Sequence, residues 1–308
     1  MIAIVVSGIT CAIFVGTFLF AFLKSKGVYD EYLEYVDKKE YSFKDFFPIG
    51  YYLNDLDLEK KLIPAKFYKY LHKYKMKLTQ NIIEIYGVKY SDYYNELHNA
   101  NRTAMAVTVA AAASLLSLIM ATSGDSSTSI MFAGLAIIAF LGMPFLVDNG
   151  LQDKIKKRRL SIRMEFPEFV NKMTILVNAG MTISKAWEKI ATDARKDTPL
   201  FREMQYALAE ISAGKPEAVA YEEFGRRCKI KEIIKFVSVV VLNLKKGGAE
   251  VVPVLKLQAT ECWEMRKSAA KQLGEEAGTK VLIPMMIMFI GIIMIVVLPA
   301  ILSFSAGM

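Results

Sequence analysis

The chain has 308 residues, of which 54% are hydrophobic, and a formal net charge of +8. The apolar residues gather in four runs without a charged side chain, which excludes an ordinary soluble domain. These runs are residues 2–23, 103–124, 129–147 and 281–308. Each is about 19 residues or longer, the length that an α-helix needs to cross a hydrocarbon core of ~30 Å. We therefore expect an all-α integral membrane protein with four transmembrane helices.

The first run, residues 2–23, has a competing interpretation as a cleaved signal peptide. A signal peptide has a basic n-region, a short apolar core and a cleavage site of small residues. No Lys or Arg precedes this run, and the run is too long for such a core. The sequence therefore predicts a retained transmembrane helix.

Basic residues are confined to two segments, and this predicts the orientation in the membrane. Residues 24–102 hold 14 Lys and Arg and residues 148–280 hold 25, whereas the turn 125–128 and both termini hold none. Because Lys and Arg near span ends stay on the cytoplasmic side, we expect both segments in the cytoplasm and both termini outside. The expected domains are a first transmembrane helix (1–23), an N-terminal cytoplasmic helical segment (24–102), a transmembrane hairpin (103–147), a cytoplasmic bundle (148–280) and a last transmembrane helix with an external C-terminus (281–308).

Residues 24–102 contain 13 of the 15 tyrosines. The spacing of apolar residues predicts a helix that ends at Gly87, followed by a second helix that Ser91 caps and that runs into the second span. The predicted apolar face is Phe67, Leu71, Tyr74, Leu78, Ile82 and Ile85. Lysines interleaved with tyrosines can indicate nucleic-acid binding, but here they favour a membrane surface, where both side chains reach the lipid headgroups. We therefore expect membrane lipids and no nucleic acid as partners of this segment.

Residues 148–280 predict six helices with short connections, which is typical of a compact all-α bundle. The first carries an apolar face from Phe166 to Val177 and ends at Gly180, and the second begins after Thr182. The third has Thr198 as its cap and Pro199 at its first position, and Gly214 ends it. The last three are expected at about 216–227, at 230–246, where Gly247-Gly248 ends the fifth, and at 251–278, which leads into the last span.

The sequence lacks motifs for catalysis, cofactors or metal ions. The chain has only two histidines, His72 and His98, far apart, and the Gly214-Lys215 pair lacks the first glycine of a phosphate-binding loop. The three cysteines have no metal-binding spacing. Small residues in the first two spans favour close helix packing. A small transporter or channel remains an alternative, although the spans of such proteins usually carry ionisable groups and the four apolar runs carry no Asp, Glu, Lys, Arg or His. A membrane enzyme or sensor of unknown type is a further alternative.

The stretch "FPEFVNKMTILVNAGMTISKAWEKIA", with the helices and last span that follow it, resembles the F-domain of bacterial type II secretion and type IV pilus platform proteins. The resemblance covers about residues 160–303. Its marks are an Ala179-Gly180 hairpin, Gly214 and Gly248 at helix ends, and Glu275 and Glu276 ahead of Lys280 and Pro284. A single F-domain with four spans is similar to the shorter Tad (Flp) pilus platform proteins, which are commonly encoded as a pair.

The resemblance implies a non-enzymatic inner-membrane platform without a cofactor. Such a platform connects pilin subunits to a hexameric cytoplasmic ATPase and assembles with itself or with a paired platform protein. The candidate partner contacts are Glu275, Glu276, Lys280, Arg226 and Arg227. The alternative is that Glu276 and Lys280 form a helical i,i+4 pair and that the arginines lie at a solvated corner. Gly180, Gly214 and Gly248 are expected to be structural turns with a left-handed backbone.

Overall fold

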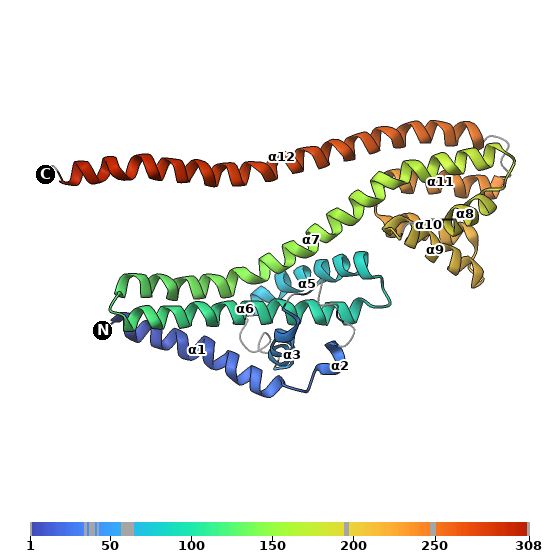
Figure 1. Cartoon of the computed structure of the whole chain (residues 1–308). Coiled ribbons are helices and arrows are strands. Elements are labelled where there is room, and N and C mark those ends of the chain that lie inside the picture. The colour runs from blue at the N-terminus through green and yellow to red at the C-terminus, as the bar shows by residue number, and fades with distance from the viewer. Residues whose placement is uncertain are drawn as a thin grey trace. The chain divides into compact units, whose positions relative to one another are not determined.

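The computed structural model of the protein describes residues 2–33, 36, 41, 43–56, 65–193, 197–246 and 251–306. Every regular element within these ranges is a helix (Figure 1), so the predicted all-α class is confirmed there. The chain divides into two compact units, Met1–Lys156 and Lys157–Met308.

Among the residues that the structure describes, four helices are long and apolar enough to cross a membrane: α1 (Ile2–Ser25), α6 (Ser91–Thr122), α7 (Ser126–Asn178) and α12 (Val251–Ala306). The first and third predicted runs lie within α1 and α7, the second ends two residues beyond α6, and the described part of the fourth lies in α12. Three of the helices continue well beyond their apolar run, and α7 and α12 are single helices of 53 and 56 residues (Figure 1). The first helix expected in the second charged segment is therefore not separate, because helix-forming residues follow the third apolar run without a break.

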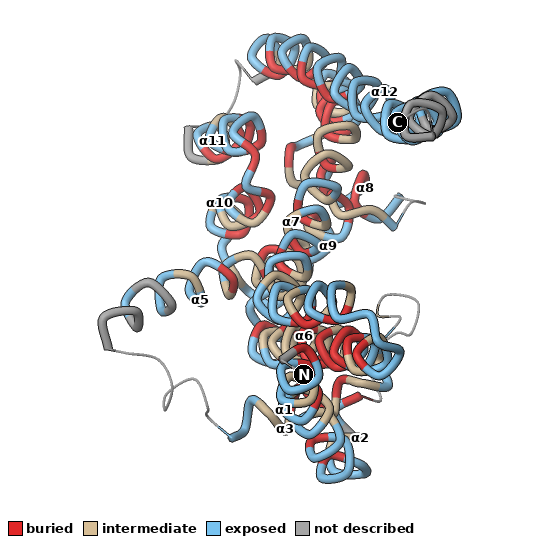
Figure 2. Tube along the Cα trace, turned by 90° about the vertical axis from the view of Figure 1, so that its left-hand side faces the viewer, coloured by how far each residue is buried: buried red, intermediate tan, exposed pale blue. Residues whose placement is uncertain are grey.

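In the first unit, α6 packs through small side chains. α1 packs against α6, and Figure 2 shows the buried stripe of α6. The buried small residues of this stripe are Ala104, Ala106, Ala110, Ala111, Ala113, Ser114, Ser117 and Ala121. Ser117 and Ser129 join α6 to α7, since each hydroxyl donates to the other residue's carbonyl oxygen at 2.8 and 3.0 Å. The small residues of the second span thus pack closely, as predicted.

Among the described residues, three short helical elements lie between α1 and the next long helix of this unit. They are α2 (Asp30–Leu33), the 3₁₀ turn η1 (Lys44–Phe46) and α3 (Phe47–Asp55). α3 crosses α6 at Gly50, where an added Cβ would lie 1.9 Å from the carbonyl oxygen of Ala100. Only glycine permits such a close approach of two helix backbones.

The next helix, α5 (Ala65–Tyr86), buries Leu78 and Ile82 in a cluster with Leu151 of α7. The predicted apolar face of α5 is confirmed in its C-terminal half, which contains Leu78 and Ile82. The side chains of Phe67 and Leu71, in the N-terminal half, lie outside the described residues. Gly87 has a φ of 81° and ends the helix as predicted. Ser91 was expected to cap α6. Tyr90 occupies the cap position instead, and the Ser91 hydroxyl donates to the carbonyl oxygen of Val88 at 2.8 Å.

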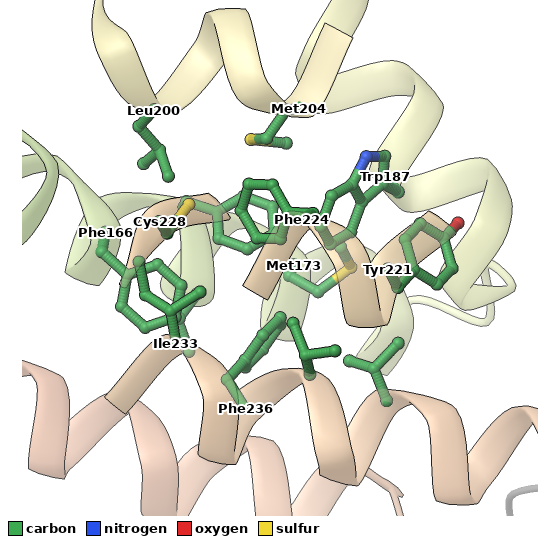
Figure 3. Close-up of a cluster of buried hydrophobic side chains, with 14 of the residues drawn as sticks. Phe166, Met173, Trp187, Leu200, Met204, Tyr221, Phe224, Cys228, Ile233 and Phe236 are labelled. Carbon is green, nitrogen blue, oxygen red and sulfur yellow. The ribbon is translucent and has the colours of Figure 1, made fainter. Parts of the chain in front are cut away.

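The second unit has one buried core formed by α7, α8 (Ile183–Thr192), α9 (Pro199–Ser212), α10 (Glu217–Cys228), α11 (Lys231–Lys246) and α12. Aromatic side chains fill its centre (Figure 3). The ring of the fully buried Trp187 lies 5.2 Å from that of Phe169, 4.5 Å from Tyr221 and 5.0 Å from Phe224. Because these residues come from α7, α8 and α10, the core fixes the helices against one another.

The helix ends of the second unit largely follow the sequence. Gly180 and Gly214 have φ angles of 91° and 96°, as expected for left-handed turns, whereas Gly248 lies outside the described residues. The Thr182 hydroxyl accepts a hydrogen bond from the Lys185 amide at 3.4 Å, which confirms that cap. Thr198 also occupies a cap position, but its hydroxyl donates to the Glu165 carboxylate of α7 rather than capping α9.

Candidate partner interface

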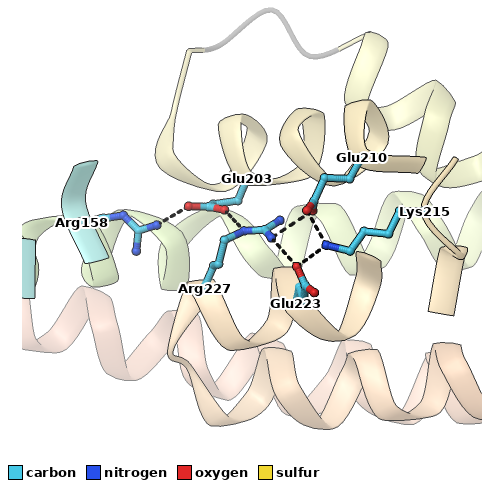
Figure 4. A network of polar contacts seen from close by, with 6 residues as sticks. All are labelled: Arg158, Glu203, Glu210, Lys215, Glu223 and Arg227. Carbon is cyan, nitrogen blue, oxygen red and sulfur yellow. Dashed lines mark hydrogen bonds and ion pairs between the residues drawn. The ribbon is translucent and has the colours of Figure 1, made fainter. Parts of the chain in front are cut away.

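Six charged side chains form a network in the second unit (Figure 4). The Arg227 guanidinium of α10 lies 2.7 Å from Glu203 and 3.1 Å from Glu210, both on α9. Glu203 also accepts from Arg158 of α7 at 2.7 Å. Opposite charges alternate along this chain of contacts, so the network binds α7, α9 and α10 together.

Lys215, in the turn between α9 and α10, completes the network. Its ammonium lies 2.6 Å from Glu210 and 2.5 Å from Glu223. Hydrogen bonds to these two carboxylates raise the pKa of Lys215 above its usual value. The hydrogen bond from Lys215, and then the charges of Lys215 and Arg227, hold the pKa of Glu223 below its usual value despite some burial. The turn that follows Gly214 is thereby held by charge as well as by backbone geometry.

The sequence alone does not indicate Arg158, Glu203, Glu210 or Glu223 as site residues. The detectable signals were the i,i+7 spacing of Glu203 and Glu210 and the i,i+4 spacing of Glu223 and Arg227, which put each pair on one side of its helix. Neither spacing indicates that α9 and α10 face each other. The network therefore depends on the tertiary fold.

The two arginines predicted as partner contacts differ in environment. Arg227 is held in the network and its guanidinium stacks 4.5 Å from the ring centroid of Tyr206, whereas the Arg226 side chain is 70% exposed and lies 3.7 Å from Glu222. The corner expected to be solvated is only partly so, because Cys228 and Ile230 are buried on either side of Lys229, which has a left-handed backbone with a φ of 53°. Arg226 is thus the accessible arginine of this pair.

The acidic residues predicted as partner contacts, Glu275 and Glu276, are exposed on α12. Glu275 lies 3.8 Å from Lys271, and Glu276 accepts a hydrogen bond from Gln272 at 3.0 Å. The alternative i,i+4 pair of Glu276 with Lys280 is not formed, since Glu276 turns toward the preceding turn instead. Glu275, Glu276 and Lys280 are all accessible where α12 enters its uncharged run.

The described residues of this unit show neither a metal-binding group nor a reactive thiol. In the described part of the chain, no group of three His, Cys, Asp or Glu side chains is placed to hold a metal ion. Burial, and then the charge of Glu203, raises the pKa of the Cys228 thiol to about 12. At neutral pH this thiol is protonated and therefore a poor nucleophile.

The network leads to a prediction about pH. The folded-state pKa of Glu223 is lower than its usual value of 4.5. The ion pairs of Glu223 therefore stabilise the fold fully at a pH above 4.5, and this stabilisation is lost as the pH falls through the folded-state pKa. We expect Glu223→Gln to lower the Tm by roughly 1–4 °C at neutral pH, as for a partly exposed pair. The difference from wild type should shrink as the pH falls below 4.5, when measured by circular dichroism in detergent. Glu264→Gln, on an exposed part of α12, is the matched control, and an equal loss in both variants would contradict a role for the network.

Comparison with known families gives one match. Residues 169–299 match the family model of protein F of the type II secretion system (T2SS). These residues lie inside the region 160–303, whose sequence resembles the F-domain. No curated protein and no solved structure gives a significant match.

Proposed function

We propose that the chain is the assembly platform of a type IV pilus of the Tad (Flp) kind or of a type II secretion machine. The support is that residues 169–299 match the family of type II secretion system protein F, as the resemblance predicted. Family members are membrane platform proteins that generally interact with secretion ATPases and with partner platform proteins. In this proposal the chain couples a hexameric ATPase to the insertion or extraction of pilin subunits. It has no enzymatic activity and needs no cofactor.

The continuity of two helices carries this proposal. Both α7 and α12 contribute to the buried core of the second unit and also contain candidate spans. A force applied to this core therefore acts directly on two membrane helices without an intervening loop. In the proposed orientation the core is cytoplasmic, where an ATPase can reach it, and both termini are outside.

The exposed charges suggest where the ATPase binds. Glu275, Glu276 and Lys280 of α12 and Arg226 of α10 are exposed. Among the described residues, the side chains of Glu275, Glu276 and Arg226 contact neighbours on their own helices. Arg227 supports this surface indirectly through the network. We propose that Glu275 and Glu276, at the junction of the core and the last span, contact basic groups of the ATPase or of the pilin.

Co-purification tests this proposal. The full-length chain is co-expressed with the secretion-type ATPase of the same cell and captured in detergent. Wild type should retain the ATPase, and Glu275→Lys/Glu276→Lys should lower the retained amount by about tenfold, because rim contacts turn from attractive to repulsive. The matched control is Glu188→Lys/Asp193→Lys, two exposed acids of α8 and its end, which should retain the ATPase.

The outcomes separate the function from the site. Capture by wild type and by both variants would support the platform and overturn the assigned contact. Absence of capture even after cross-linking would contradict the coupling to an ATPase and favour the alternative, a small transporter or channel. Ion or solute flux in liposomes then tests that alternative, which is disfavoured because the uncharged runs contain no ionisable Asp, Glu, Lys, Arg or His.

A further inference from the structure

A polar cluster in the first unit marks the depth at which two spans begin. Arg102 directly precedes the second uncharged run and Asp148 directly follows the third. The Nε2 of His98 lies 2.8 Å from Asp148 Oδ1, and the Nε of Arg102 lies 3.9 Å from Asp148 Oδ2. His98 and Asp148 are buried. The cluster therefore ties α6 to α7 at the membrane border.

Tyr74 fixes α5 at this same level. Its hydroxyl donates to the Asp148 carboxylate, and its ring lies 5.5 Å from the Arg102 guanidinium. Burial, and then the hydrogen bond to Asp148, raises the pKa of Tyr74 to about 12. The hydroxyl thus stays protonated and donates at any physiological pH. Together with the packing of Leu78 and Ile82, this contact holds α5 beside the border of the two spans.

α5 also carries a row of exposed lysines. Lys69, Lys73 and Lys77 follow one another at intervals of four residues and are exposed. Like charges at this spacing destabilise a helix unless an anion neutralises them. No ion pair of these three lysines is present among residues that the structure describes. Each is at most five residues from Tyr74, or about 8 Å along the helix axis, which is comparable to the thickness of a headgroup layer.

We propose that the row Lys69–Lys73–Lys77 of α5 is a binding site for the phosphate groups of anionic phospholipids. The row carries three positive charges at headgroup depth, where lipid phosphates are the most abundant anions. Long lysine side chains reach this layer while the helix itself remains packed on α6. The sequence predicts that this segment contacts lipid, but it does not show where. The Tyr74–Asp148 contact places these three lysines beside the border of the spans. The proposal does not depend on an ATPase or on a pilin.

Lipid titration of the full-length protein in detergent tests the site. Phosphatidylglycerol should raise the Tm of wild type more than phosphatidylcholine does, and added salt should reduce the difference. The variant Lys69→Gln/Lys73→Gln/Lys77→Gln should show an apparent affinity for phosphatidylglycerol that is lower by about tenfold or more. The matched control is Lys185→Gln/Lys189→Gln/Lys256→Gln, three exposed lysines of the second unit, and it should bind as wild type does.

A charge-preserving variant separates binding from folding. Lys69→Arg/Lys73→Arg/Lys77→Arg should retain the preference for phosphatidylglycerol, because arginine binds phosphate as lysine does. Equal responses of wild type to the two lipids, or an unchanged preference in the glutamine variant, would overturn the proposal. The same holds if inorganic phosphate alone reproduces the Tm gain, since the site would then bind a free anion rather than a lipid.

Discussion

Trp187→Ala should destabilise the second unit by about 3–5 kcal/mol, the range for a large aromatic residue removed from a core. Trp187 is fully buried and contacts aromatic rings of α7 and α10. Its indole nitrogen has no hydrogen-bond partner among the described residues, so the substitution removes packing without leaving a polar group unpaired. Since whole domains are stable by only about 5–15 kcal/mol, we expect a markedly lower Tm and a smaller monodisperse fraction in detergent.

The chain supplies its own control for this substitution, because it has just one other tryptophan. Trp263 of α12 is 57% exposed, and the Arg266 guanidinium lies 5.4 Å from its ring centroid. Trp263→Ala should therefore destabilise the protein by less than about 1 kcal/mol. Melting curves followed by circular dichroism compare the Tm of Trp187→Ala with that of Trp263→Ala. Similar losses of Tm would mean that the aromatic cluster is not the centre of the core.

Gly50→Ala should separate α3 from α6 in the first unit. The added Cβ would lie 1.9 Å from the carbonyl oxygen, 2.6 Å from the carbonyl carbon and 2.9 Å from the Cα of Ala100. All three atoms belong to the backbone, so a change of rotamer cannot relieve the overlap, and the helices must move apart. We expect a loss of about 1–3 kcal/mol or more, seen as a lower Tm and faster proteolysis between the first two spans.

Gly150→Ala is the matched control for this prediction. Gly150 lies in the interior of α7, where an added Cβ meets nothing within 4 Å. Alanine is the better helix former by about 1 kcal/mol, so this variant should be as stable as wild type or slightly more stable. If Gly50→Ala also melts like wild type, the close crossing of α3 and α6 is wrong.

The sequence by itself determined the helical class and the candidate spans, because uncharged runs as long as a membrane is thick permit few other structures. It also determined local turns such as Gly87, Gly180 and Gly214, where a left-handed backbone requires only the residue itself. The resemblance to the secretion family rests on the order of such short sequence features along the chain, for example the Ala179-Gly180 hairpin and Gly214 at the end of a helix. All of these features depend on residues close together along the chain.

The tertiary structure decided which side chains meet. Arg227 and Arg226 are adjacent in sequence, yet one is enclosed by Glu203 and Glu210 of another helix and the other is exposed. Tyr74 and Asp148 are likewise 74 residues apart and join only because α5 and α7 pack in one unit. Helix periodicity shows which face of a helix is apolar but not which helix will cover it, and so the charged network and the lysine row at the membrane border required the fold.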